Sequence, residues 1–509
     1  MARERIALAA SEGFSVLNEE DLFLLQWYGL FPQKDEPDLW VFRFMPPMGQ
    51  LASSQLKWFS KKLPSTAFLN LTARQSVQVE GIASKDLEDW LSESEAAGLF
   101  ARGAGGDTVR NIVTCPVAGL DGRELFDVSG LVRDLSVRFH RNPDFVNLPR
   151  KLKVSIAACP EQCQQPEIHC VSFVGALREQ DGEKLPGFDL WVGGGLSGSV
   201  AFAQRLGGWL PADQAVPVLE AIAGIYRNSA DCRTNRDRAR LRHLIADWGI
   251  ERFKTTLQER LSFPLEDVPV PVDPLESVRD HLGVREEKES GFFYASVFVP
   301  SGRLTVPQLK KLADIVDRYG DGTARVTPRK NLIIPHLLQE RVAQVLEGLD
   351  SVGLKTQASS LLRGMNACPG ADSCTRAQVH TRGRLEEWSL YLKQQVLLSE
   401  PVSIHFSGCQ AQCEQDAVAG IGIQGRSSLV DGKPVELFDL FAGGQLGARR
   451  RSAEPVAHDL PSDQVPLAIE RLLMLYKKKR QPGESFSDYC ARVGVPLLKE
   501  AAVPPVAAE

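Results

Sequence analysis

The chain has 509 residues, of which 43% are hydrophobic and 24% charged, with a formal net charge of -5. This length exceeds one hydrophobic core and predicts several domains, and the ordinary composition excludes disordered or collagen-like classes. The mild acidic excess argues against a nucleic-acid partner, and the sequence contains no apolar run of the roughly 18 residues needed to cross a membrane and no signal peptide, so we expect a cytoplasmic protein.

The sequence repeats itself in order along the chain. FDLWVGGGL at 188–196 returns as FDLFAGGQL at 438–446, and LPADQ at 210–214 returns as LPSDQ at 460–464, both shifted by 250. With small gaps, FMPPMGQLASSQLK at 44–57 resembles FVPSGRLTVPQLK at 298–310, and TARQ at 72–75 resembles TPRK at 327–330. An ordered match of this extent predicts two similar halves about a pseudo-two-fold axis.

The sequence of each half predicts the same series of secondary-structure elements. A strand, an amphipathic helix and a second strand come first, then a cysteine-bearing stretch, then a strand with a glycine-rich exit and a final helix. In the second half, VTPRKNLIIP at 326–335 has the β-branched, proline-bounded pattern of the second strand. The pattern predicts an α+β fold with mixed sheets. The apolar face of the last helix predicts five core residues: Val465, Ile469, Leu472, Leu473 and Tyr476.

Ten cysteines in a cytoplasmic chain favour metal or redox chemistry over disulfides. In the second half, Cys368 and Cys374 form a C-x5-C pair, and Cys409 and Cys413 form a C-x3-C pair. Four thiolates in two short loops can surround an iron–sulfur cubane. Structural zinc sites use shorter spacings in both pairs. The spacing therefore favours iron–sulfur, with zinc or unliganded buried thiols as the alternatives.

This cysteine pattern, placed in the second half of a duplicated chain, resembles the siroheme-containing nitrite/sulfite reductases. Further matches extend from about residue 21 to about residue 493: YGLFPQ at 28–33, TARQ at 72–75, RN at 110–111, LPRK at 148–151, WVGGG at 191–195 and NLII at 331–334. The resemblance implies that Cys368, Cys374, Cys409 and Cys413 hold a 4Fe–4S cluster. It also implies that the Cys413 sulfur bridges to the siroheme iron.

The resemblance also implies a division into domains. We expect ferredoxin-like half-domains in both repeats and a larger mixed-sheet domain in each half. The boundaries are an N-terminal arm at 1–40, half-domains at 41–110 and 280–360, a first siroheme-pocket domain at 111–267, a linker at 268–279, a cluster domain at 361–497 and a flexible tail at 498–509.

The first half keeps part of the cysteine pattern. Cys159 and Cys163 repeat the C-x3-C pair, and Cys115 takes the place of Cys368, but Asp121 stands six residues after Cys115, where a cysteine would complete the set. We expect buried vestigial thiols in this half, with a second cluster as the alternative.

The resemblance implies a cationic pocket for siroheme carboxylates and a small anion. Arginine suits bidentate binding of carboxylates, and lysine can also release a proton. The substrate positions are Arg43, Arg110, Lys151 and Lys153, and the siroheme positions are Arg74, Gln78, Arg329 and Asn331. Members of this family that reduce sulfite tend to have Lys-x-Lys where nitrite reductases have Lys-x-Asn. We therefore expect sulfite as the substrate, with nitrite as the alternative.

Electrons must come from another protein, because the chain contains no G-x-G-x-x-G nucleotide fingerprint. The resemblance implies ferredoxin or a separate flavoprotein as donor, and we expect a monomer. The basic runs at 449–451 and 477–480 could steer an acidic ferredoxin, although such runs are commonly solvated helix ends. Rival interpretations are a relative that oxidises a corrin precursor and a non-enzymatic iron–sulfur or zinc protein.

Overall fold

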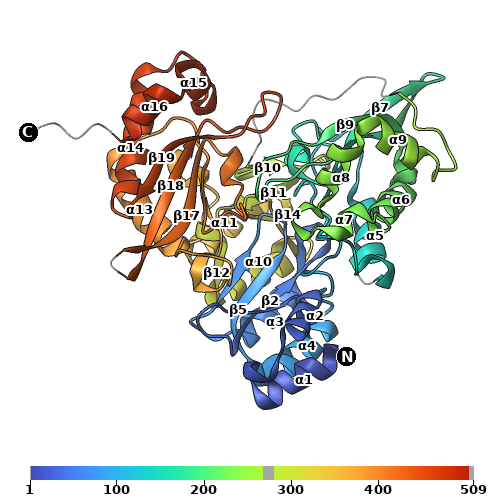
Figure 1. Ribbon diagram of the computed structural model, residues 1–509, viewed down its shortest axis with the longest axis horizontal. Helices are drawn as coiled ribbons and strands as arrows, with labels where there is room; N and C mark the ends of the chain where they lie inside the picture. Colours follow the sequence, from blue (N-terminus) through green and yellow to red (C-terminus); the bar gives the residue numbers. More distant parts are fainter. Residues whose placement is uncertain (1, 141, 268–279, 431, 504–509) are drawn as a thin grey trace, which may run out of the picture. The chain divides into compact units, whose positions relative to one another are not determined.

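The computed structural model describes residues 2–140, 142–267, 280–430 and 432–503 (Figure 1). The chain divides into two compact units, one formed by Met1–Gly195 with Ala201–Gln357 and the other by Leu196–Val200 with Ala358–Glu509. The linker predicted at 268–279 lies outside the described residues. Within the described ranges, no helix combines the length and the apolar character that a membrane span requires.

The first unit contains two five-stranded sheets of the same design, in the orders β1-β2-β5-β4-β12 and β10-β11-β14-β13-β3. The strands of one sheet are β1 (Leu30–Pro32), β2 (Leu39–Phe44), β5 (Val77–Ala83), β4 (Phe68–Leu71) and β12 (Arg303–Thr305). The strands of the other are β10 (Gly283–Glu286), β11 (Phe292–Val297), β14 (Leu332–Leu338), β13 (Thr323–Val326) and β3 (Gln50–Ala52).

The two sheets exchange one short strand each. The β3 strand comes from the first half of the sequence but pairs with β13, and β12 comes from the second half but pairs with β4. Each exchanged strand follows a tight turn, in which Met48 and Ser301 have positive φ. The central residues Leu51 and Leu304 are fully buried in one core that both sheets share. This reciprocal exchange confirms the duplicated fold predicted from the sequence.

Helices pack around the shared core. Helices α3 (Ser53–Lys62) and α10 (Val306–Tyr319) directly follow the exchanged strands and pack against each other. Helix α10 begins with a capping box, in which Thr305 and Gln308 each accept a backbone N–H of the other. The remaining helices of this part are α1 (Ala2–Glu12), α2 (Glu19–Trp27), α4 (Leu87–Ala96) and α11 (Val342–Asp350).

The segment predicted as one strand, 326–335, is divided by a turn: Val326 ends β13, residues 327–331 form the turn, and residues 332–335 begin β14. The Thr327 hydroxyl accepts the backbone N–H groups of Arg329 and Asn331 at 3.2 and 3.0 Å. Lys330 has a φ of 60°. A threonine that bonds the backbone two and four residues ahead stabilises a turn and interrupts the strand.

Each unit also contains a mixed sheet. In the first unit it has the order β6-β7-β8-β9, and in the second β15-β16-β17-β18-β19. The first comprises β6 (Val154–Ala157), β7 (Val171–Gln180), β8 (Glu183–Val192) and β9 (Gln204–Pro211), with helices α5 (Ser129–His140), α6 (Ala215–Arg227), α7 (Asp231–Thr234), α8 (Leu241–Trp248) and α9 (Ile250–Gln258). The second comprises β15 (Met365–Ala367), β16 (Ile404–Ser407), β17 (Ile421–Val430), β18 (Lys433–Ala442) and β19 (Glu454–Leu460), with helices α12 (Ser360–Gly364), α13 (Arg382–Gln395), α14 (Gln464–Lys479), α15 (Phe486–Val493) and α16 (Val495–Ala502).

The two mixed sheets have the same register. Val154 pairs with Val171 in parallel β6 and β7, and Ile404 pairs with Ile421 in parallel β16 and β17, so both partners are shifted by 250. Because a slip of one residue would turn every side chain to the opposite face, an identical register means an identical pattern of inward-facing positions.

The C-terminal helices complete the second unit. All five residues predicted as the core face of α14 are buried, which confirms that prediction. The tail predicted to be flexible from residue 498 is helical as far as Ala502, and Leu498 and Ala502 are buried. Helix α16 packs against α14 and β19, so burial of its apolar side chains orders a segment whose proline and alanine content suggested a tail.

Candidate active site

A row of polar side chains crosses the first five-stranded sheet. Arg43 in β2 lies directly opposite Gln78 in β5, which lies opposite Asn70 in β4, which lies opposite Arg303 in β12. Paired residues of antiparallel strands point to the same face. The register therefore brings the predicted residues Arg43 and Gln78 together on one face of the sheet.

The second sheet lacks this row at the matching positions. There Ser296 pairs with Ile333, which in turn pairs with Arg325. A serine and an isoleucine thus stand where the first sheet has Arg43 and Gln78. At these two positions only the first sheet has an arginine and a glutamine.

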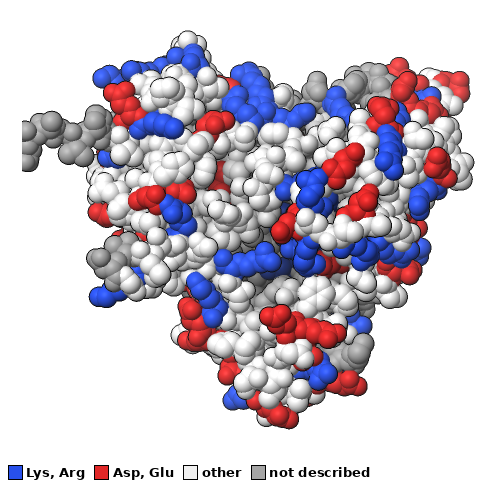
Figure 2. All heavy atoms as spheres, in the orientation of Figure 1, with Lys and Arg blue, Asp and Glu red and all other residues white. Residues whose placement is uncertain are grey.

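Three more cations lie on one side of a short parallel pairing. Val109 pairs with Leu152 in a parallel bridge, and both are buried in the core. Side chains alternate across extended backbone. Arg110, Lys151 and Lys153 therefore point away from that core, which places three predicted residues on a common face. Figure 2 shows a band of Lys and Arg side chains over the first unit, in the region between β2 and α7 in Figure 1.

Arg43 and Arg110 converge on one carbonyl oxygen. Arg43 Nη1 and Arg110 Nη1 both donate to the oxygen of Ala104, at 3.1 and 2.6 Å. Arg110 Nη2 also donates to the oxygen of Gly106 at 2.7 Å, and Arg43 lies over the ring of Phe31 at 4.6 Å. These contacts hold two guanidinium groups side by side in spite of their like charge.

Arg74 is positioned by a turn and by a histidine that the sequence did not single out. It precedes Gln75, which has a φ of 55°. Arg74 Nη2 donates to the oxygen of Asn111 at 2.8 Å, and Nη1 lies 3.0 Å from His169 Nε2. His169 Nδ1 lies 2.8 Å from the oxygen of Gln165. An imidazole that donates from Nδ1 and accepts at Nε2 satisfies both contacts and is neutral.

Burial and neighbouring positive charges lower the pKa values of three side chains in this cluster. Burial lowers the pKa of Arg110 well below its ordinary value, and Arg43 and Arg74 lower it further. Burial lowers the pKa of Arg74 to about 10. Burial, then Arg74 and then Lys153, lowers the pKa of His169 well below its ordinary value. The Nε atoms of Arg74 and Arg110 are buried and have no hydrogen-bond partner among the described residues. A partly buried cationic cluster with spare donors fits an anionic ligand.

Arg329, the second-half counterpart of Arg74, lies with Asn331 in an equivalent turn. Asn331 is buried, and its Oδ1 accepts the backbone N–H of Val299 at 3.0 Å. Its side-chain oxygen thus stabilises the turn before β12. Arg329 is partly buried in the same turn. Ligand contact by Arg329 and Asn331 stays a prediction.

The second unit positions four cysteines on two loops. Cys368 directly follows β15, and Cys374 lies six residues later. Cys409 and Cys413 follow β16, which pairs in parallel with β15. Because the strands are parallel neighbours, their exits lie at the same edge of the sheet, and the N–H of Gly408 donates to Cys368 Sγ at 3.2 Å. The burial differs along the set: Cys368 is buried, Cys374 and Cys409 are intermediate, and Cys413 is exposed.

A hydrogen bond and close backbone packing fix the conformation of the two cysteine loops. Thr381 Oγ1 donates to the oxygen of Cys368 at 2.6 Å. Gly370 has a φ of +68°, and a Cβ there would lie 2.4 Å from Thr381 Oγ1, so only glycine fits. In the C-x3-C loop, Gln412 and Gln415 have positive φ. Non-glycine residues in this region are strained and persist where the surrounding structure holds them.

The thiols influence one another electrostatically. Burial, with a contribution from Cys413, raises the pKa of Cys368 to about 12. Burial also raises the pKa of Cys409, with contributions from Cys413 and Cys374. Four thiols on two loops that leave the same edge of the sheet fit a multinuclear metal centre, because metal coordination displaces thiol protons.

The two basic runs have different surroundings. Arg451 Nη2 donates to Asp488 at 2.8 Å, and Arg449 lies 3.1 Å from the same carboxylate, so this run forms ion pairs within the unit. Residues 477–480 are exposed, and three of them are lysines in the last turn of α14. Cations there suit the negative end of the helix dipole.

Two family models match the chain. The nitrite and sulphite reductase 4Fe-4S domain matches residues 105–265 and 358–507. The nitrite/sulfite reductase ferredoxin-like half domain matches residues 285–352.

Similar proteins match almost the full length. The ferredoxin–nitrite reductase of Synechococcus elongatus is 34% identical over 482 residues, covering 93% of this chain and 93% of its own. Sulfite reductase (ferredoxin) 1 of Mycolicibacterium paratuberculosis is 31% identical over 520 residues, covering 96% and 92%. The structure of the Mycobacterium tuberculosis NirA protein superposes with a TM-score of 0.91 at 29% identity, covering 98% of this chain and 95% of that one.

Proposed function

Because the chain belongs to the nitrite/sulfite reductase family, whose members contain siroheme and a 4Fe–4S cluster, we propose that it reduces sulfite to sulfide with electrons from ferredoxin. The observation that carries this proposal is the cationic cluster. Two guanidinium groups share the Ala104 carbonyl, and two lysines lie on the same face as one of them. A doubly charged anion gains more from such a site than a singly charged one.

The cations have separate roles in this proposal. Arg43 and Arg110 bind the substrate oxygens, since their shared backbone contact fixes both forks in one place. Arg74, with His169 behind it, and Gln78 bind the carboxylates of siroheme. The spare Nε donors of Arg74 and Arg110 support these assignments.

Lys151 and Lys153 supply protons. Reduction of the sulfite dianion takes up six electrons and seven protons and yields hydrosulfide and three waters, so each departing oxygen leaves as water. An ammonium beside the substrate can give its proton to such an oxygen and recover it from solvent. Both lysines are partly buried, which keeps them in reach of solvent.

In this proposal Cys368, Cys374, Cys409 and Cys413 would hold the cluster. The cluster and siroheme would supply single electrons to the bound substrate. We expect Cys413→Ser to abolish turnover of both sulfite and nitrite. Cys490 is another cysteine of the same unit and is buried in its hydrophobic core. Cys490→Ser is therefore the control and should keep turnover of both anions.

Nitrite is the second candidate substrate. It is favoured by the similarity to the Synechococcus elongatus ferredoxin–nitrite reductase, at 34% identity over nearly all of both chains. For the electron donor, the names of the similar proteins support ferredoxin. The exposed lysines at 477–479 offer a surface for an acidic partner.

Anaerobic turnover of the siroheme-loaded protein with a reduced dye tests the proposal, with sulfite and nitrite in parallel and sulfide and ammonia as products. We expect sulfite to give sulfide with the higher kcat/KM. A higher kcat/KM for nitrite would establish the second candidate instead. Loss of both activities in a protein with intact tetrapyrrole absorption would point to a corrin-oxidising relative.

A further inference from the structure

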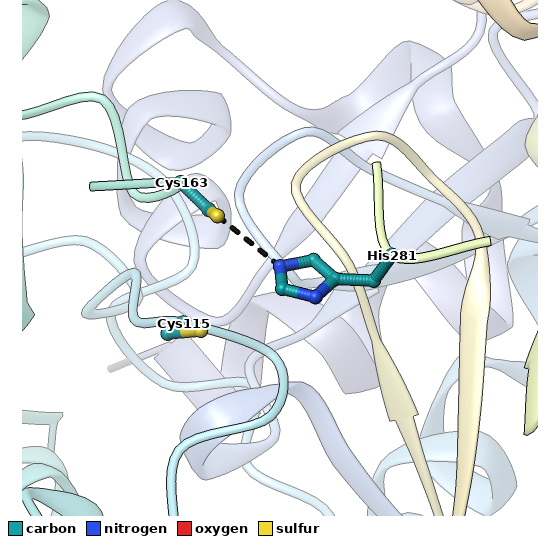
Figure 3. Close-up of side chains that lie close together, drawn as sticks. All are labelled: Cys115, Cys163 and His281. Atoms are coloured by element: carbon teal, nitrogen blue, oxygen red, sulfur yellow. Dashed lines mark hydrogen bonds between the residues drawn. The ribbon is translucent and has the colours of Figure 1, made fainter. Parts of the chain in front are cut away.

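Three buried side chains of the first unit gather at a place where the sequence predicted only vestigial thiols. The ligand atoms of Cys115, Cys163 and His281 all lie within 4.8 Å of one another (Figure 3). Cys163 Sγ is 3.1 Å from His281 Nε2. Each of the three side chains is at most 3% exposed. Among the residues that the structure describes, no other group of three His, Cys, Asp or Glu side chains lies so close together.

A fourth ligand lies beside this group. Cys159 is buried, and its thiol, like that of Cys163, lies within interaction range of Cys115. Its sulfur lies outside the 4.8 Å group, so a side-chain rotation is needed to bring it to the centre. The set is then three sulfurs and one imidazole nitrogen.

His281 adds a ligand atom to the group from outside the two cysteine loops. In the second half the fourth cysteine is Cys374, and the first half has Asp121 at that spacing. Asp121 is committed elsewhere, because its Oδ1 accepts Arg123 Nε at 2.9 Å. His281 enters from residues just before β10 with a φ of 60°, a strained conformation that aims its ring at the two thiols (Figure 3).

The close spacing favours a single ion over a cubane. With metal–sulfur bonds of about 2.3 Å and metal–nitrogen bonds of about 2.0 Å, a tetrahedral ion separates its ligand atoms by roughly 3.5–4 Å. A four-iron cluster stands between its thiolates and requires a wider space. In the second half, no three of the four described cluster cysteines come within 4.8 Å of one another. The compact group thus joins two first-half cysteines with His281, whereas the second-half cysteines form a wider set.

We propose that Cys115, Cys159, Cys163 and His281 bind one thiophilic divalent cation, with zinc preferred, as a structural site separate from the catalytic cofactors. Zinc suits three thiolates and one imidazole in a closed, buried site. The ion would join His281 to Cys163, which lies 118 residues earlier in the sequence. An ion that closes so long a loop stabilises the folded state.

Metal analysis of the full-length holoenzyme tests this proposal. We expect one zinc per chain besides the iron of the cofactors. Cys163→Ser and His281→Asn should each lose the zinc and keep the iron content and the siroheme absorption. Cys232→Ser is the matched control, because Cys232 is a buried cysteine of the same unit outside the group, and it should keep the zinc.

Cobalt provides a readout that does not depend on the variants folding. Wild-type protein grown with Co²⁺ should show intense thiolate-to-cobalt absorption with a tetrahedral pattern of weaker bands. Wild-type protein that contains neither zinc nor cobalt with such bands would overturn the proposal, as would zinc retained in both variants. An iron content that falls in Cys163→Ser by the amount of one four-iron cluster would also overturn it, in favour of a second cubane.

Discussion

Replacing Lys153 with asparagine removes one ammonium from the cationic cluster and tests the choice of substrate. One unit charge about 5 Å from another contributes about 3 kcal/mol at an effective dielectric constant of about 20. Lys153 is partly buried, so solvent screening reduces this to about 1–1.5 kcal/mol. Sulfite carries one more negative charge than nitrite and loses about that much more. We expect the ratio of kcat/KM for sulfite to that for nitrite to fall about tenfold.

The assay is anaerobic dye-driven turnover of both anions by Lys153→Asn and wild-type protein at equal siroheme content. Lys254→Asn is a suitable control, because this partly buried lysine of the first unit donates to the oxygen of Gly207, away from the cluster. It should leave the ratio unchanged. If Lys153→Asn lowers turnover of both anions by the same factor, the charge argument for sulfite is wrong and Lys153 acts equally on either substrate.

Three further predictions concern stability. Thr381→Val removes the bond to the Cys368 oxygen at 2.6 Å and should cost about 1–2 kcal/mol, seen as a lower urea midpoint and faster loss of cluster absorption. Gly194→Ala would place a Cβ 2.4 Å from a backbone oxygen and should lower the free energy of unfolding by at least about 2 kcal/mol. Gly130→Ala is the control: its Cβ would have no atom within 4 Å, so it should not lower the Tm. Burial raises the pKa of Asp416 from 3.8 to about 6, so the folded state binds this proton more tightly than the unfolded state does. The free energy of unfolding should therefore fall as the pH rises from about 4 to 6. Asp416→Asn should remove that part of the dependence of stability on pH.

Periodic and repeated features were predictable from the sequence. The duplication, the core face of α14 and the α+β class follow from spacing that the chain displays locally or at a constant shift. The same reasoning failed at 326–335, where β-branched residues suggested one strand. There a single threonine hydroxyl bonds two backbone N–H groups and makes a turn. It also failed at α16, which is ordered by tertiary packing that composition does not reveal.

Two histidines have contacts that the spacing of residues in the sequence could not predict. His169 lies 95 residues from Arg74 in the sequence, and His281 lies 118 residues from Cys163. Neither belongs to a local pattern of metal ligands or catalytic groups. Their roles arise only when the fold brings distant segments together, so a single sequence gives no signal for them. The reciprocal exchange of β3 and β12 was missed for the same reason.

The two halves kept their backbone while their side chains diverged. Gln162 and Gln165 have positive φ in the first half, as Gln412 and Gln415 do in the second, at the constant shift of 250. Such strain lasts only where the surrounding structure holds it in place. The metal proposed for Cys115, Cys159, Cys163 and His281 would give the first half a reason to keep this strained loop, as the cluster would in the second half.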